Sequence, residues 1–191
     1  ILSKKKHNLK NSDNVLLLAT GPRNHQSIGH DVNVWKKYES TIKLIYNVVS
    51  RHNLKLIIKR HPDIAENDFS PEFYSHFSDV KIFKNGDLLE LLNDSKLVIS
   101  LGVSSGILES QILEKPVISI DAEYDVFGST DYIPNSCLHI PIEKFENFLS
   151  KILTEPDKFD ELIQKGKNSI YLNISNIGKS SQIMFDTLIK L

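Results

Sequence analysis

The chain has 191 residues, enough for one domain with a substantial hydrophobic core. Its 23 lysines and arginines nearly balance 24 aspartates and glutamates, which argues against a non-specific nucleic-acid binder, because such proteins need a basic excess. The single cysteine, Cys137, excludes an internal disulfide and a cysteine-based metal site. No apolar run reaches the roughly 18 residues that span a bilayer, so we expect a cytoplasmic protein.

The chain opens with a polar segment and continues with alternating strand and helix patterns. Residues 1–14 carry four lysines, which is typical of a linker or tether and would also suit contact with the inner face of a membrane. Residues 15–19 are continuously apolar and predict a buried strand. Apolar residues at spacings of three and four between 35 and 49 predict an amphipathic helix. Residues 54–58 predict the next buried strand.

Residues 64–79 are polar and irregular, and after them the strand and helix pattern resumes. It predicts a strand at 80–83, a turn at Asn85-Gly86, a helix at 88–92, a strand at 97–101, a loop at 102–106, a helix at 107–114 and a strand at 116–120. A long loop at 122–136, a strand at 137–140 and helices at 142–153, 157–171 and 180–191 complete the chain.

Alternation of buried strands with helices indicates an α/β fold, a doubly wound parallel sheet with additional C-terminal helices. We divide the chain into a linker or tether at 1–14, a Rossmann-like domain at 15–175 and a terminal helix at 176–191. In such sheets ligands bind outside the carboxyl ends of the strands. The polar loops at 20–24, 60–63 and 102–106 all lie at that edge, so together they predict a ligand site.

The loop Ser104-Ser105-Gly106 precedes a helix, and its N–H groups and hydroxyls suit a phosphate. An ordinary helix N-cap would use the same groups, and the sequence does not separate the two interpretations. Glu109, in the first turn of that helix, could accept hydrogen bonds from a ribose diol or simply complement the helix dipole. These features make the loop a candidate nucleotide site.

His61 follows a buried strand, and Pro62 restricts it to extended geometry. A histidine held there could donate a charge-assisted hydrogen bond to a phosphate or protonate a leaving oxygen; a loop histidine that only packs or caps is an equal alternative. Arg60 and Lys59 could serve the same anion, and alternation along the strand implies that only one of them faces the site.

No metal site is expected. The set His25, His30 and Asp31 matches no helix face, and the aspartates at 121, 125 and 131 are more typical of a solvated loop. The sequence also lacks a Walker lysine motif and a GxGxxG loop after the first strand, which disfavours P-loop hydrolysis and dinucleotide binding.

His61-Pro62, Ser104-Ser105 and the segments SSGILES and EKPVISID resemble the donor-binding half of GT-B glycosyltransferases, which have two Rossmann domains. The likeness is strongest to bacterial capsule, sialic-acid and Kdo transferases and to CDP-glycerol glycerophosphotransferases. It implies transfer of a sugar or glycerol phosphate from a nucleotide donor to an acceptor hydroxyl in surface-polysaccharide synthesis. Gly178-Lys179-Ser180-Ser181 resembles the closing segment of these proteins, whose last helix packs back toward the partner domain.

The resemblance also implies roles for particular residues. His61 would be catalytic and would contact the donor phosphate. The cleft and the phosphate and ribose sites would be formed by Thr20, Gly21, Arg60, His61, Pro62, Ser104, Ser105, Gly106 and Glu109, and the base would be bordered by Phe83, Lys84, Asn85 and Gly86.

No cofactor beyond a CMP-, CDP- or UDP-linked donor is implied, and the motifs favour cytidine. The acceptor would be a glycan or a lipid-linked glycan. An N-terminal acceptor domain bearing the catalytic base is absent from this chain, so whether the chain alone is an enzyme stays open. Two alternatives also stay open: a non-catalytic nucleotide-sugar-binding module, and a UDP-sugar 2-epimerase-like domain that converts its donor without an acceptor.

Overall fold

The computed structural model describes residues 13–21, 32–62, 68–77, 79–101, 104–121, 135–174, 176 and 178–189. Within these residues, six parallel strands form one sheet in the order β3-β2-β1-β4-β5-β6. The strands are β1 (Asn14–Ala19), β2 (Lys55–Arg60), β3 (Lys81–Phe83), β4 (Leu97–Leu101), β5 (Val117–Ile120) and β6 (Leu138–Ile140). The predicted parallel α/β sheet is therefore confirmed.

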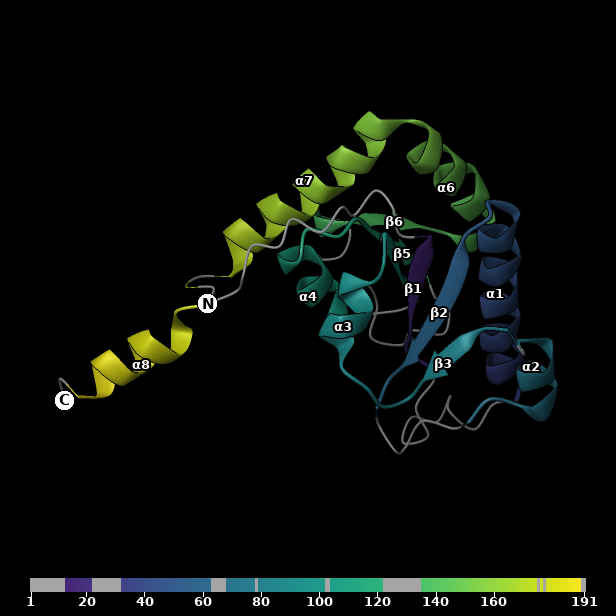
Figure 1. Ribbon diagram of the computed structural model, residues 1–191, viewed down its shortest axis with the longest axis horizontal. Helices are drawn as coiled ribbons and strands as arrows, with labels where there is room; N and C mark the ends of the chain where they lie inside the picture. Colours follow the sequence, from purple (N-terminus) through teal and green to yellow (C-terminus); the bar gives the residue numbers. More distant parts are fainter. Residues whose placement is uncertain are drawn as a thin grey trace.

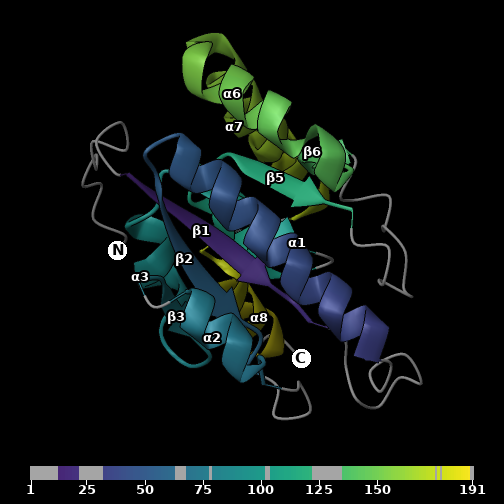
Figure 2. The same cartoon turned by 90° about the vertical axis from the view of Figure 1, so that its right-hand side faces the viewer.

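Helices cover both faces of the sheet (Figure 1). On one face lie α1 (Val32–Arg51), α2 (Pro71–His76) and α6 (Phe145–Thr154), which follows a 3-10 turn, η3 (Ile142–Lys144). On the other lie α3 (Leu88–Asn93) and α4 (Gly106–Ile112), and α7 (Pro156–Asn173) crosses from α6 to contact α4. Figure 2 shows α1 running across one face of the sheet, while α8 (Ser180–Leu188) extends beyond the domain at the end of α7.

Strand residues alternate between two hydrophobic clusters. Val15, Leu17 and Ala19 of β1 pack with the buried residues of α1, whereas Leu16 and Leu18 pack on the α3–α4 side. The same alternation along β2 places Ile58 on the α1 side and Ile57 on the α3–α4 side. The α1 side forms the larger core.

The irregular structure predicted for 64–79 is wrong for residues 71–76, which form α2. Ser70 is the N-cap of this helix, and its Oγ accepts from Phe73 N–H at 3.2 Å, while Pro71 occupies the first turn. The helix forms because three phenylalanines spaced four residues apart stack into the core. The ring centroids of Phe73 lie 4.0 Å from Phe69 and 4.3 Å from Phe77.

The other predicted elements are present with small shifts at their ends. Strand β2 continues through Arg60 rather than stopping at Ile58, and α6 begins at Phe145 after the 3-10 turn. The predicted loop at 122–136 lies mostly outside the described residues. Among the described residues, no helix is long and apolar enough to cross a membrane.

Candidate functional site

A pocket of about 470 Å³ opens at the carboxyl ends of the central strands. The described residues of the three loops predicted to converge here do so, and the loop that follows β3 joins them. The pocket is lined by Leu18, Thr20, Lys59, Arg60, His61, Pro62, Lys84, Asn85, Gly86, Leu88, Ser104, Ser105, Gly106 and Glu109.

Size alone does not distinguish this pocket. A hollow of about 500 Å³ lies near the amino ends of β1 and β2, and another of about 550 Å³ lies between α4 and α7. Only the first of the three has the position at which open parallel sheets bind ligands, outside the carboxyl ends of the strands. We therefore take it as the candidate site.

Two of the predicted site residues lie apart from the pocket lining. Gly21 is buried next to Thr20 but does not line the pocket. Phe83 packs against the cluster on the α3–α4 side and borders the hollow at the opposite end of the sheet. The loop after it does reach the pocket, because Gly86 adopts a φ of +127° and turns the chain toward α3.

The loop before α4 is ordered by its own hydroxyl. The N–H of Gly106 donates to Ser104 Oγ at 3.2 Å, and the Ser104 carbonyl accepts from Ile107 N–H at 3.1 Å. Ser105 occupies the N-cap position but makes no capping hydrogen bond through its side chain, which is exposed at the pocket. The capping interpretation of the paired serines therefore applies to Ser104, whereas Ser105, exposed in the pocket lining, has no side-chain capping role.

Gly106 brings the start of α4 unusually close to the sheet. A Cβ at this position would lie 2.8 Å from Leu18 Cδ1, 3.3 Å from Ser104 Oγ and 3.4 Å from Leu88 Cδ2. Side chains of β1 and α3 thus leave room for glycine alone without displacement. The position of residues 104–106, which we call the serine loop, is therefore set by the packing of the core beneath it.

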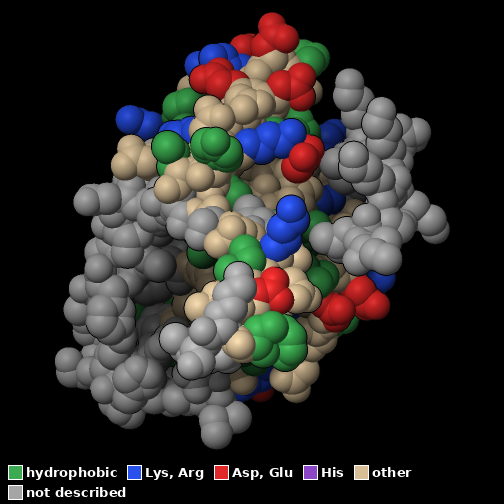
Figure 3. All heavy atoms as spheres, turned by 90° about the vertical axis from the view of Figure 1, so that its left-hand side faces the viewer, with side chains coloured by type: hydrophobic (Ala, Val, Ile, Leu, Met, Phe, Trp, Pro, Cys, Tyr) green, Lys and Arg blue, Asp and Glu red, His purple; other side chains and the backbone are tan. Residues whose placement is uncertain are grey.

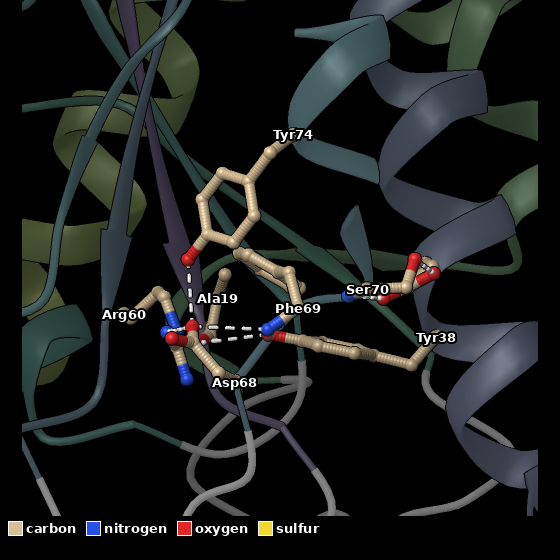
Figure 4. A network of polar contacts seen from close by, with 8 residues as sticks. Ala19, Tyr38, Arg60, Asp68, Phe69, Ser70 and Tyr74 are labelled. Atoms are coloured by element: carbon tan, nitrogen blue, oxygen red, sulfur yellow. Dashed lines mark hydrogen bonds and ion pairs between the residues drawn. The ribbon is translucent and has the colours of Figure 1, made fainter. Parts of the chain in front are cut away.

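Arg60 lines the pocket, but its guanidinium belongs to a network on the α1–α2 side of the sheet (Figure 4). The side chain is 3% exposed, forms an ion pair with Asp68 and lies 4.8 Å from the ring centroid of Phe69. Tyr74 Oη donates to Asp68 at 2.6 Å. This hydrogen bond and the nearby Arg60 charge lower the pKa of the Asp68 carboxyl, while burial and Asp68 raise the pKa of Tyr74.

The same network fixes residues 68–70, which lead into α2. Ser70 donates to the Glu39 carboxylate of α1 from its N–H at 2.7 Å and from its Oγ at 2.8 Å. Tyr38, also of α1, donates to the carbonyl of Ala19 at the end of β1 at 3.2 Å (Figure 4). Helix α1 is therefore bonded to the end of β1, beside the pocket, and to the start of α2.

The side chain of Lys59, which the sequence left as an alternative to Arg60, lies on the opposite side of the sheet from the Arg60 guanidinium. Its Nζ donates to the carbonyl oxygens of Arg60 at 2.7 Å and of Lys84 at 2.8 Å. The alternation along β2 thus directs Lys59 to the pocket side and Arg60 to the α1 side. His61 and Glu109 both line the pocket and are half-buried.

The acidic and histidine sets considered for metal binding fall largely outside the described residues, which include Asp121 but not His25, His30, Asp31, Asp125 or Asp131. Among the residues that the structure does describe, no three His, Cys, Asp or Glu side chains gather closely enough to hold a metal ion.

The sequence has no significant match among protein-family models or curated proteins, whereas the fold matches solved structures. The UDP-GlcNAc 2-epimerase of Neisseria meningitidis, bound to UDP-GlcNAc, aligns over 95% of this chain and 46% of its own, with a TM-score of 0.61 and 18% identity. The C-terminal CMP-Kdo binding domain of WaaA from Acinetobacter baumannii aligns over 85% of this chain and 91% of that domain, with a TM-score of 0.54 and 15% identity. WaaG, a glycosyltransferase involved in lipopolysaccharide biosynthesis, aligns over 87% and 45%, with a TM-score of 0.51 and 16% identity.

At these identities the likeness shows the fold. The chain has the Rossmann-like fold of one half of a GT-B protein, which confirms the fold that the sequence motifs implied. It spans less than half the length of the epimerase and of WaaG, and most of the length of the isolated WaaA domain.

Proposed function

We propose that this chain is the donor-binding domain of a surface-polysaccharide glycosyltransferase, which moves a sugar or glycerol phosphate from a nucleotide to an acceptor hydroxyl. The observation that carries the proposal is the pocket itself. Segments far apart in the sequence, ending in His61-Pro62, Asn85-Gly86 and Ser104-Ser105-Gly106, border one cavity at the strand ends of a nucleotide-sugar-binding fold.

In this proposal the serine loop binds the donor phosphate through the Ser105 hydroxyl and the main chain at Gly106. His61 contacts the same phosphate and protonates or stabilises it as it departs, which is the principal electrostatic requirement of the transfer. Glu109, one turn into α4 and lining the same pocket, accepts hydrogen bonds from the ribose. The loop at 84–86 borders the base. The donor would be CMP-, CDP- or UDP-linked, and no metal is required.

Calorimetric titration of the purified domain with CMP, CDP, UMP, UDP, GDP and ADP, without added metal, tests the proposed donor site. We expect selective binding of one base, weakened at least tenfold in Ser105→Ala and His61→Ala, because each removes a polar contact to the phosphate. Ser75→Ala and His76→Ala, both on the exposed side of α2, are the matched controls. Absence of binding to all six nucleotides would refute the proposal.

Glu109→Gln separates the ribose role from a helix-dipole role. If the carboxylate binds the diol, the substitution weakens nucleotide binding about tenfold and leaves the affinity for inorganic phosphate unchanged. An equal loss for both ligands would remove the diol role of Glu109.

A UDP-sugar 2-epimerase is the second candidate, favoured by the alignment of 95% of the chain with such an enzyme. Product analysis distinguishes the two. An epimerase converts UDP-GlcNAc with no acceptor present, whereas a transferase consumes its donor only with one. A non-catalytic module would bind nucleotide and do neither.

We further propose that residues 176–191 pack toward a partner domain that carries the acceptor site and the catalytic base. Apolar side chains are exposed along this end of the molecule, among them Leu172, Met184 (62% exposed) and Phe185 (58% exposed), and Figure 3 shows hydrophobic side chains on this face. Four lysines in residues 1–14 support a tether between the domains, at the cytoplasmic face of a membrane. Co-sedimentation with anionic vesicles, lost when these lysines are replaced by glutamine, tests the membrane contact.

A further inference from the structure

Two walls of the pocket come from the chain at the ends of β2 and β3. These strands pair in parallel, and the last paired residues are Lys59 and Phe83. Beyond that pair the chains diverge: β2 continues to Arg60 and the His61-Pro62 turn, while the other chain leaves the sheet at Lys84. The pairing between β2 and β3 therefore stops at the level where the pocket begins, whereas β2 pairs with β1 through Arg60.

Where the pairing of β2 with β3 stops, the side chain of Lys59 connects the two chains instead. Its Nζ donates to the carbonyl oxygen of Arg60 at 2.7 Å and to that of Lys84 at 2.8 Å, so one ammonium group joins both walls. The side chain is only 8% exposed. Hydrogen bonds from a charged donor are shorter and stronger than neutral ones, and burial protects them from competition by water.

The loop held in this way is short and leads directly into a helix. Gly86 turns the chain with its φ of +127°, and Asp87 then caps α3 by accepting from Leu89 N–H at 2.8 Å. Between the end of β3 and this cap, the Lys84 carbonyl is the point at which the Lys59 ammonium attaches the loop to β2.

We propose that Lys59 is a positioning residue that sets the spacing between the His61-Pro62 turn and the base-bordering loop at 84–86. The proposal rests on the proposed function, in which a nucleotide base lies against that loop. Lys59 acts through the two main-chain carbonyls, and its contribution to binding is geometric. It therefore determines how well the base fits, and the phosphate site at the serine loop is independent of it.

The first test needs no ligand. Amide hydrogen exchange at 84–87 is measured in the wild type, in Lys59→Met and in Lys55→Met. Lys55→Met is a matched control because it removes an exposed lysine side chain from the same strand, away from the pocket lining and outside the measured segment. We expect exchange at 84–87 to accelerate about tenfold or more in Lys59→Met and to stay unchanged in the control. Unchanged exchange in Lys59→Met would overturn the proposal.

Lys59→Gln provides the same test if Lys59→Met does not fold, because its amide can still donate to one carbonyl. We expect a smaller acceleration of the same amides, and none would again overturn the proposal. The second measurement compares affinities for CMP, UDP and inorganic pyrophosphate. Lys59→Met should weaken binding of the nucleotide that the wild type prefers by about tenfold and leave pyrophosphate unaffected.

An equal loss of affinity for nucleotide and pyrophosphate would show that Lys59 acts as the cation of the phosphate site, and the positioning role would fall. If the wild type binds neither CMP nor UDP, the proposed function loses its support for these donors, while the exchange measurement still decides whether Lys59 joins the two walls.

Discussion

Replacing Gly106 by alanine should displace the start of α4 and weaken both stability and ligand binding. The added methyl group would lie 2.8 Å from Leu18 Cδ1, closer than carbon atoms pack, and 3.3 Å from Ser104 Oγ, which is a tight contact. Leu18 is 4% exposed and held in the cluster on the α3–α4 side, so it has little room to withdraw. The helix, with the serine loop attached, is the part that can shift.

The size of the effect follows from two opposing contributions. Overpacking a buried site costs about 1–3 kcal/mol, whereas alanine in a helix is preferred over glycine by up to about 1 kcal/mol. We therefore expect Gly106→Ala to lower the free energy of unfolding by about 1–2 kcal/mol. Leu18→Ala alone should cost about 2–5 kcal/mol. The double variant should cost less than the sum by about 1 kcal/mol or more, because the new methyl group fills part of the cavity.

Urea unfolding measures these free energies, and the nucleotide titration measures binding. Gly166→Ala is the matched control, since its methyl group would lie 2.9 Å from Gln111 Cγ at the contact of α4 with α7, away from the pocket lining. It should lower stability to a similar extent and leave nucleotide affinity unchanged. Wild-type stability in Gly106→Ala, or full additivity with Leu18→Ala, would refute the packing argument.

Three further predictions concern stability. Burial lowers the pKa of Lys115 from 10.5 to about 8, so between pH 8 and pH 10.5 the unfolded chain binds more protons than the folded one. The free energy of unfolding should therefore rise between these two pH values, and urea titrations at each pH should show no such rise in Lys115→Met. The lowered pKa of Asp68 contributes stability above about pH 3.8, and this stability is lost as the pH falls through the folded value. The carboxyl is largely exposed, so Asp68→Asn should lower the free energy of unfolding by less than about 1 kcal/mol, and a larger loss would contradict this. Phe73→Ala should cost about 3–5 kcal/mol in the same assay, and a loss below 1 kcal/mol would contradict its place in the core.

The strands of the sheet were predictable because each is a short, continuous apolar run buried on both faces. Residues 15–19 and 97–101 show this pattern, and both form strands. Helix α2 was missed because it is only six residues long and mostly polar, and Phe69 and Phe77, which pack with its Phe73, lie just outside its two ends. The signal that could have identified it was their spacing of four together with Ser70-Pro71, a typical helix start.

The convergence of the pocket loops was predictable, because parallel strands place their carboxyl ends on one edge. The directions of Lys59 and Arg60 were not. Alternation gives opposite faces for neighbouring residues, but which face holds the pocket depends on the strand order and on where the helices pack. Asp68, which pairs with Arg60, lies eight residues further along and carries no sequence pattern that marks it as the partner.

Helix α4 lies between the pocket and α7 and contacts both. Its first residues line the pocket, and its last turn touches α7, where Gly166 lies against Gln111 and Lys167 pairs with Glu114 at 3.0 Å. From Gly166, α7 runs about 10 Å further to its end at Asn173, and a rotation of about 10° at this contact would move that end by about 2 Å. Any rotation of α7 about its contact with α4 would therefore be largest at the end of the helix that leads to α8.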